Sequence, residues 1–169
     1  MNPRKMLDDM RTIKALLTDA ERIAREMGEQ EPGAEHLLLS AIELPDASAA
    51  RALARLGLDA DRVRSALRQE QADALVSAGV PRDTAEAMAE PTPLGVSGTP
   101  LLYRAGPSGR AVMQETSKLA SSAKQRLAGA HVVLAVAGLE RGTVPRALDR
   151  LGVDRQQLAD AARAELAVR

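Results

Sequence analysis

The chain has 169 residues and no formal net charge at pH 7, because 23 Lys and Arg residues balance 23 Asp and Glu residues. A balanced chain has no global field to hold it on nucleic acid or on an anionic membrane. The absence of Cys excludes disulfides, thiolate nucleophiles and Cys-based zinc sites. We therefore expect a cytoplasmic protein with no nucleic-acid or membrane partner.

The core must be aliphatic, since the sequence contains no Trp or Phe and a single Tyr, Tyr103. A mixture rich in Leu and Ala favours close-packed helices over a sheet. No apolar run is long enough to cross a bilayer, and the acidic residues near the N-terminus do not fit a signal peptide. The composition predicts one all-α domain over 1–169.

The first two predicted helices follow from apolar spacing. Apolar residues at steps of three and four indicate a helix over 7–27, which Gly28 ends. After a polar stretch, a second helix over 35–44 is apolar nearly all round. We expect this second helix to be central and buried.

Two more helices complete the first half. Ser48 is a suitable N-cap for a short third helix through Leu56, and Gly57 supplies the left-handed residue after it. Asp59 then caps a fourth helix, which 72–78 can extend.

Residues 70–107 match neither half and are interpreted as a linker. Residues 83–89, after Pro81, can form a short extra helix. The prolines and glycines of 91–100 cannot sustain regular structure, so this stretch is expected to be mobile.

The second half predicts the same four helices in the same order. The first runs over 108–122, and 131–139 repeats the apolar second helix. Thr143 opens the third, which Gly152 closes. Asp154 then forms a capping box with Gln157 at the start of the fourth.

The two halves are copies of one another. Arg51-Ala-Leu-Ala-Arg-Leu-Gly-Leu-Asp59 returns at Arg146-Ala-Leu-Asp-Arg-Leu-Gly-Val-Asp154, an offset of 95 residues that extends back to His36 and His131. A repeat of this length means two similar bundles packed together. We therefore expect an all-α fold of two tandem four-helix repeats, 7–69 and 108–166, related by pseudo-twofold symmetry and joined by a long, partly irregular linker.

The repeat motif resembles a known family. Gly33-Ala-Glu-His-Leu-Leu-Leu-Ser-Ala-Ile42, followed by the Leu-Gly turn at Gly57, is similar to the N-terminal domain (Clp repeat) of Clp-type AAA+ unfoldases. The resemblance covers about 13–67 and 108–166. Because the sequence has no Gly-x-x-x-x-Gly-Lys-(Ser/Thr) loop, it suggests a stand-alone ClpC-like N-domain protein without ATPase modules.

The resemblance also implies a function and a site. It implies a non-enzymatic accessory or regulator of the Clp protease system that binds the unfoldase, adaptors, client proteins or peptides. In some members the repeat's Glu helps to bind phosphoarginine on clients, and Glu35 matches it. In the second half Ala130 stands in its place. The expected binding residues at the two helix N-termini are Gly33, Ala34, Glu35, Gly129 and Ala130.

Other residues have structural interpretations. We expect His36 and His131 to pack in the core with a ring nitrogen bonded to a carbonyl, and Gly57 and Gly152 to serve helix ends. No cofactor or metal is expected, since two histidines in separate repeats have no partner ligands. The Arg residues of the third and fourth helices are interpreted as a solvated, salt-bridged face. Met6, Met10 and Met27 are interpreted as core filling.

Two alternatives remain open at this point. The chain could be a decoy that sequesters peptides or small molecules directed at the unfoldase's receptor domain. It could also be the N-terminal receptor fragment of a full-length ATP-dependent unfoldase. An all-helical DNA-binding regulator is disfavoured, because the helices carry mixed charges rather than a coherent basic face.

Overall fold

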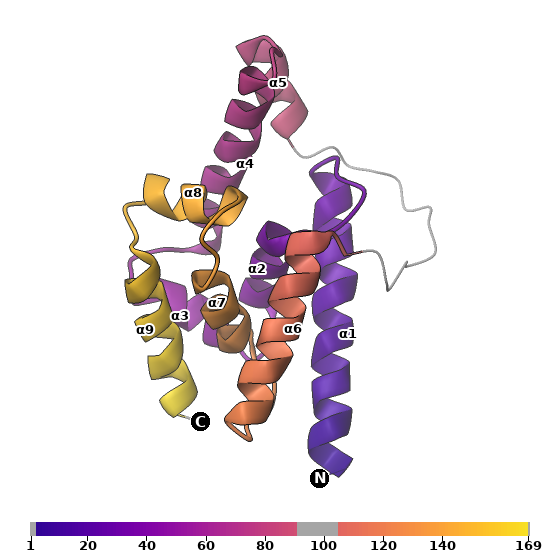
Figure 1. The fold of residues 1–169 in the computed structure, drawn as a ribbon, viewed down its shortest axis with the longest axis vertical. Coiled ribbons are helices and arrows are strands. Elements are labelled where there is room, and N and C mark those ends of the chain that lie inside the picture. The colour runs from indigo at the N-terminus through magenta and orange to yellow at the C-terminus, as the bar shows by residue number, and fades with distance from the viewer. Residues whose placement is uncertain (1–2, 91–104, 169) are drawn as a thin grey trace.

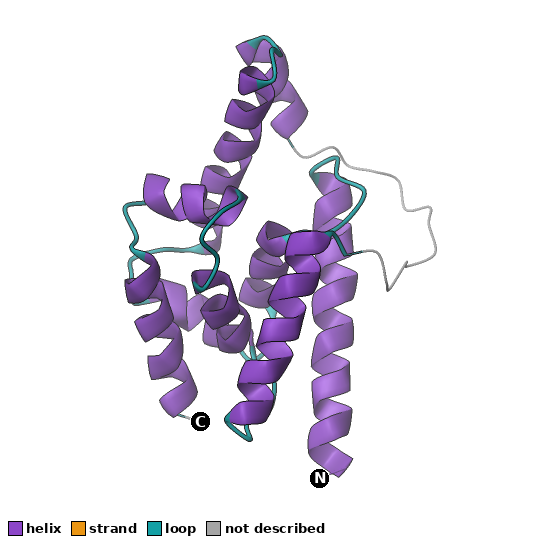
Figure 2. Ribbon diagram, in the orientation of Figure 1, coloured by secondary structure: helices purple, strands orange, loops and turns teal. Residues whose placement is uncertain are grey.

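A computed structural model of the chain describes residues 3–90 and 105–168, and over these residues it is helical without a strand (Figures 1 and 2). No described helix is long and apolar enough to traverse a bilayer. In chain order the helices are α1 (Pro3–Glu26), α2 (Ala34–Glu43), α3 (Ser48–Ala54), α4 (Ala60–Ser77), α5 (Arg82–Ala89), α6 (Pro107–Ser122), α7 (Gly129–Ala137), α8 (Thr143–Arg150) and α9 (Arg155–Ala167).

Helix α1 begins four residues earlier than the apolar spacing predicted, and it ends as expected before Gly28, whose φ of 77° is left-handed. The early start changes the interpretation of its methionines. Met27 is buried, but Met6 and Met10 are 51% and 56% exposed. The prediction that all three fill the core was therefore wrong for the two that lie in the extended N-terminal part.

Helices α2 and α7 form the centre of the molecule and contact each other (Figure 1). Leu37, Leu38 and Leu39 on α2 are at most 1% exposed, as expected for a helix that is apolar all round. Helix α1 packs on α2 as α6 packs on α7. The expected pseudo-twofold arrangement of two tandem four-helix repeats is thus confirmed.

The two repeats exchange their third helices. Helix α3 of the first repeat packs on α9 of the second, and α8 of the second repeat packs on α4 of the first. Figure 1 shows both pairs side by side, with α8 beside α4 and α3 beside α9. Each repeat therefore packs its third helix on the fourth helix of the other, and the two repeats interlock.

Buried carboxylates fasten both exchanged pairs. The Glu165 carboxylate accepts hydrogen bonds from Arg51 at 2.7 Å and Arg55 at 2.8 Å. At an offset of 95 residues, Glu70 accepts from Arg146 and Arg150, both at 3.0 Å. These arginines are partly exposed and salt-bridged, as the sequence predicted, and they also join one repeat to the other.

The caps and turns of the third and fourth helices agree with the sequence, with one correction. Gly57 and Gly152 have φ of 69° and 70°, and Asp59 and Asp154 cap α4 and α9 through their side chains. Ser48, however, is not the N-cap of α3. Ala47 holds that place with a φ of 51°, because Ser48 is buried and bonded elsewhere.

Part of the predicted linker is helical. Helix α4 continues to Ser77, and α5 packs back on it as a separate projection with its own small core around Ala72, Ala85 and Ala89 (Figure 1). The stretch 91–100, interpreted from the sequence as a mobile linker, lies within residues 91–104, outside the described residues.

Candidate functional site

The segment before α2 brings the expected site residues of the first repeat together. Gly33 is the N-cap of α2, and a Cβ built on it would lie 2.3 Å from Glu35 Oε1. Any side chain at 33 would thus displace the Glu35 carboxylate, which folds back over the start of its own helix. Pro32 O accepts the Gly106 amide at 3.0 Å, so the start of α6 supports the same turn.

Glu35 lies beside a second carboxylate. One oxygen each of Glu29 and Glu35 and a ring nitrogen of His36 lie within 4.8 Å of one another. Burial raises the pKa of Glu29 to about 7, and the charge of Glu35 adds to the shift. Burial also raises the pKa of Glu35. Two crowded, poorly solvated carboxyls favour the approach of a cationic group.

His36 is fully buried, and it is held differently from the prediction. Its Nδ1 accepts the Gly33 amide N–H at 2.9 Å, so the ring bonds a backbone donor and not a carbonyl. A neutral ring with Nδ1 as acceptor carries its proton on Nε2. Burial disfavours the charged ring and lowers the pKa of His36 to about 4. The histidine is therefore a structural cap for α2 and no general base at neutral pH.

The titrations of His36 and Glu29 have opposite effects on the stability of the fold as the pH changes. The unfolded chain binds more protons at His36 between pH 4 and 6.5, so this residue removes stability as the pH falls through that range. The folded chain binds more protons at Glu29 between pH 4.5 and 7, so this residue removes stability as the pH rises. Near neutral pH the ionisation of Glu29 dominates, and a cation beside it would offset that loss.

The same three groups are a weak metal site. Carboxylates and imidazole are suitable ligands for zinc, but Nδ1 of His36 is committed to the Gly33 amide. A metal at that nitrogen would leave the buried N–H of Gly33 without its acceptor. The arrangement suits an organic cation that hydrogen-bonds the carboxylate oxygens better than it suits a metal ion.

The start of α7 is closed to a ligand. Ala130 is fully buried, its amide bonds Ser48 Oγ at 2.8 Å, and the Gly129 amide bonds Asp46 Oδ2 at 3.2 Å. His131 Nδ1 accepts the Ala128 amide at 3.2 Å, as His36 does in the first repeat. The segment before α3 thus fills the place that a ligand of the second repeat would need.

At the start of α2 the amides are also largely committed. The Ala34 amide bonds Ser108 Oγ at 3.2 Å, and the Glu35 carboxylate accepts its own backbone N–H. Few backbone amides at the start of α2 are therefore left to donate hydrogen bonds to a phosphate. What the structure leaves available in this half is the pair of carboxylates.

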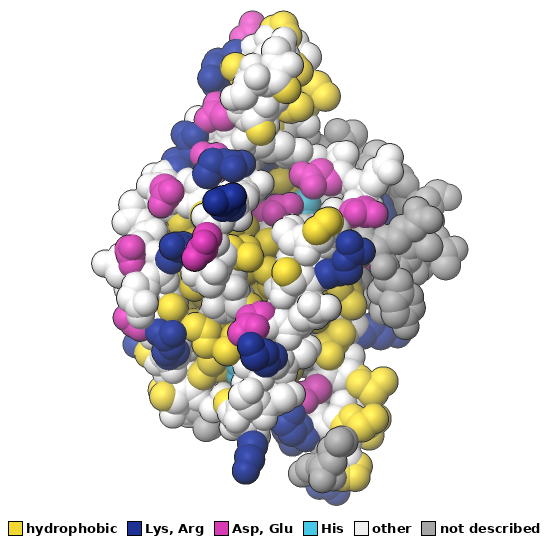
Figure 3. Space-filling view, viewed as in Figure 1, with side chains coloured by type: hydrophobic (Ala, Val, Ile, Leu, Met, Phe, Trp, Pro, Cys, Tyr) yellow, Lys and Arg dark blue, Asp and Glu magenta, His cyan; other side chains and the backbone are white. Residues whose placement is uncertain are grey.

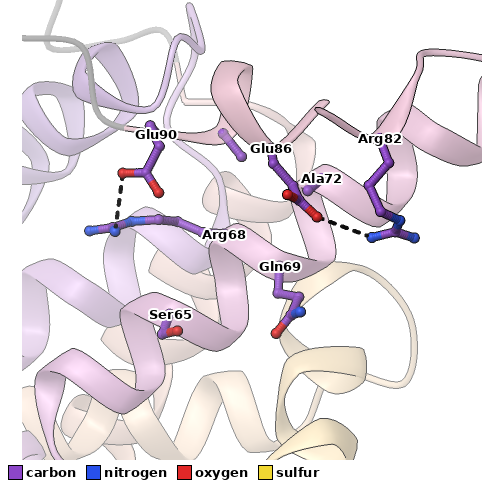
Figure 4. A pocket seen from close by; sticks show the side chains of 8 residues that line it. Ser65, Arg68, Gln69, Ala72, Arg82, Glu86 and Glu90 are labelled. Atoms are coloured by element: carbon purple, nitrogen blue, oxygen red, sulfur yellow. Dashed lines mark ion pairs between the residues drawn. The ribbon is translucent and has the colours of Figure 1, made fainter. Parts of the chain in front are cut away.

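A separate open cavity of about 270 Å³ lies between α4 and α5 (Figure 4). Arg68 faces Glu90 at 3.8 Å and Arg82 faces Glu86 at 3.5 Å, so each cation is matched by a carboxylate. Ser65 lines this cavity without a histidine among its lining residues. The charges are those of a solvated rim, and they do not form a nucleophile with a base.

Sequence reasoning missed Glu29, Asp46 and Ser108 as neighbours of the expected sites. Glu29 follows the turn at Gly28, and only folding brings it onto Glu35. Asp46 and Ser108 accept hydrogen bonds from backbone amides of the other repeat, which lie 83 and 74 residues away in the sequence. The one available signal was that Asp46 precedes the predicted third helix and Ser108 begins a predicted helix, which are positions where short polar side chains bind backbone amides.

Comparison with known proteins agrees with this architecture. The family described as "Clp repeat (R) N-terminal domain" matches residues 11–91. A search of curated proteins finds no significant match. Among solved structures, the N-terminal domain of the caseinolytic protease associated chaperone ClpD from Arabidopsis thaliana is similar in fold, with a TM-score of 0.55, 17% identity, and coverage of 92% of this chain and 94% of that chain.

Proposed function

Because the chain carries a Clp repeat N-terminal domain over residues 11–91 and has the fold of such a domain, we propose that it is a non-enzymatic accessory or regulator of the Clp protease system. In this role it binds adaptors, client proteins or peptides. The observation that carries the proposal is the family match joined to a duplicated fold in which both histidines are buried caps.

We place client binding in the first repeat, at Glu29 and Glu35. A guanidinium group offers planar N–H donors that match a carboxylate, and it would relieve the repulsion that the charge of Glu35 exerts on the partly buried Glu29. The ligand class is therefore an arginine side chain, with phosphoarginine as its modified form. Since the nearby amides bond Ser108 and Glu35, the guanidinium contributes more to recognition than the phosphate.

Replacing Glu35 with alanine should remove partners without unfolding the protein, because burial disfavours the ionised carboxylate and the change removes that cost. The test is a pull-down from the native cytosol with wild type, Glu35→Ala and the matched control Glu31→Ala. Glu31 lies in the same turn but is exposed. We expect wild type and control to retain the Clp unfoldase or arginine-bearing clients, and Glu35→Ala to lose them.

Two outcomes would count against the proposal. Retention of the same partners by Glu35→Ala would remove Glu35 from the site. Absence of every Clp component from the wild-type sample would oppose the role in the Clp system. Adding free arginine or phosphoarginine as a competitor separates the two ligand forms, and thermal unfolding of each variant checks that it is folded.

A further inference from the structure

The second repeat contains an open apolar groove that the proposed Glu35 site does not use. It has a volume of about 550 Å³, lies between α6 and α9, and is also lined by Leu134 of α7 and by Gly138, which follows that helix. Figure 3 shows hydrophobic side chains gathered in this region. Two charged residues line the walls, Glu115 on α6 and Arg163 on α9. We call this feature the α6–α9 groove.

The corresponding place in the first repeat is spanned by a side chain. Glu43 occupies the position equivalent to Gly138, at the offset of 95 residues. Its carboxylate joins Arg22 of α1 at 3.1 Å to Arg64 of α4 at 2.9 Å. In the first repeat, the space between the first and fourth helices is thus occupied by an aliphatic side chain whose carboxylate pairs with basic residues of both helices.

The second repeat has lost this bridge. Gly138 supplies no side chain, and Ala159 stands at the position equivalent to Arg64. Gly138 has φ of −77° and ψ of −11°, a conformation open to any residue, so backbone geometry does not require the glycine. The absence of the side chain leaves the groove open.

The basic side chain of the first helix remains. Lys118 is equivalent to Arg22, at an offset of 96 residues. The offset here is one residue larger than 95 because the loop after α6 is one residue shorter than the loop after α1. The turn residues Gly28 and Lys124, which both have a positive φ, are also 96 residues apart. Arg22 pairs with Asp19 as well as Glu43. Lys118 pairs with Glu115 at 3.4 Å and is 73% exposed, so it can form an ion pair with a further carboxylate, as Arg22 does.

On the α9 side the charged lining residue is Arg163, whereas on the α6 side it is Glu115. Arg163 lines the groove and pairs with Asp160 at 2.8 Å while remaining 56% exposed. Arg155 donates to Leu139 O at 2.8 Å and lines an adjoining cavity of about 350 Å³. A carboxylate entering over Gly138 would thus meet cations from α6 and α9, with an apolar floor beneath it.

We propose that the α6–α9 groove binds a segment of a partner protein that presents a Glu or Asp carboxylate beside an aliphatic side chain. The aliphatic side chain packs on Leu134, and the carboxylate takes the place that Glu43 holds in the first repeat. This surface selects acidic segments, whereas the Glu35 site selects cationic ones. The protein therefore has two binding surfaces of opposite preference, one in each repeat.

The test uses a fluorescein-labelled peptide of alternating Leu and Glu, with alternating Leu and Lys as the charge-swapped probe, followed by fluorescence anisotropy. We expect saturable binding of the acidic peptide to the wild type. Gly138→Glu, which places a carboxylate of the chain itself at the groove, and Lys118→Glu, which changes only an exposed side chain, should each weaken binding about tenfold or more. Gly138→Ala should bind as the wild type does.

The reverse substitution tests the same idea in the other repeat. Glu43→Gly should open the first groove and raise the stoichiometry from one acidic peptide towards two. Tighter binding of the Lys peptide, unchanged binding by both Gly138→Glu and Lys118→Glu, or no saturable binding would overturn the inference. None of these outcomes affects the Glu35 pull-down, because that experiment depends on the other repeat.

Discussion

Replacing Gly129 with alanine should lower the free energy of unfolding by about 3 kcal/mol, at the upper end of the usual range for overpacking. Gly129 begins α7 where that helix meets α2 and α3. A Cβ there would lie 2.9 Å from both Ala41 O and Ala49 Cβ, and 3.2 Å from the Ala49 amide nitrogen. None of these atoms is the end of a flexible side chain, so whole helices must move.

Urea denaturation followed by far-UV circular dichroism measures this effect. The matched control is Gly138→Ala, in the same helix region but exposed, where the nearest atom, Ala135 O, lies 3.2 Å from the added Cβ. We expect the control to stay within about 1 kcal/mol of the wild type, since a compatible Gly-to-Ala change mainly affects the unfolded chain. Equal stabilities for the two variants would show that α2, α3 and α7 do not meet as described.

Removing the charges of both Glu165 and Glu70, whose ion pairs join the two repeats, should lower the free energy of unfolding about as strongly as the Gly129 change. Glu165 and Glu70 are only 5% and 8% exposed, and each accepts hydrogen bonds from two arginines of the other repeat. Hydrogen bonds to charged groups contribute roughly 1.5–3 kcal/mol, reduced here because the arginines are about half exposed. We expect about 1.5 kcal/mol for Glu165→Gln, a similar loss for Glu70→Gln, and near-additivity in the double variant.

The pH dependence of stability is a second test of the predicted role of Glu165. Hydrogen bonds from Arg51 and Arg55 lower the pKa of Glu165 below its ordinary value of 4.5. Its contribution is therefore complete above that value and is lost as the pH falls through the lower, folded pKa. Unfolding curves measured across acidic pH should show a smaller acid loss for Glu165→Gln than for wild type.

A surface ion pair is the control for the measurements on Glu165 and Glu70. Glu86 pairs with Arg82 at 3.5 Å and is 59% exposed, so Glu86→Gln should change the stability by less than about 0.5 kcal/mol. If Glu165→Gln and Glu70→Gln were as mild as this control, these ion pairs would contribute no more to stability than an ordinary solvated, salt-bridged surface. The exchange of third helices would then rest on apolar packing alone.

The sequence predicted most of the fold because local signals define its helices. Apolar spacing located α1, α2 and α7, and side chains that bind backbone amides placed the starts of α4 and α9 at Asp59 and Asp154. These features depend on neighbours within one or two helical turns. They can therefore be read without knowing how the helices pack.

The exchange between repeats could not be read in the same way. Arg51 and Glu165 are 114 residues apart, and no local pattern links them. A signal did exist, since Arg51, Arg55 and Glu70 recur as Arg146, Arg150 and Glu165 at the common offset of 95 residues. The equivalence therefore extends to Glu70, one residue beyond the predicted boundary at 69.

The candidate site was predicted only in part. Glu35 was identified through the family motif, but Glu29 joins it only because the turn at Gly28 folds the chain back. The second expected site, at Gly129 and Ala130, is filled by Asp46 and Ser48 from the other repeat. The first difference comes from a turn within one repeat, and the second comes from the interlocking of the two repeats.

The central proposal is that this protein acts by binding within the Clp system. The most direct measurement is the rate at which a Clp unfoldase and its peptidase, purified from the same cells, degrade a client as the purified chain is added. We expect the rate to change saturably, and the Glu35→Ala variant to need a higher concentration for the same change. A degradation rate that is identical at every concentration of the chain would contradict the account.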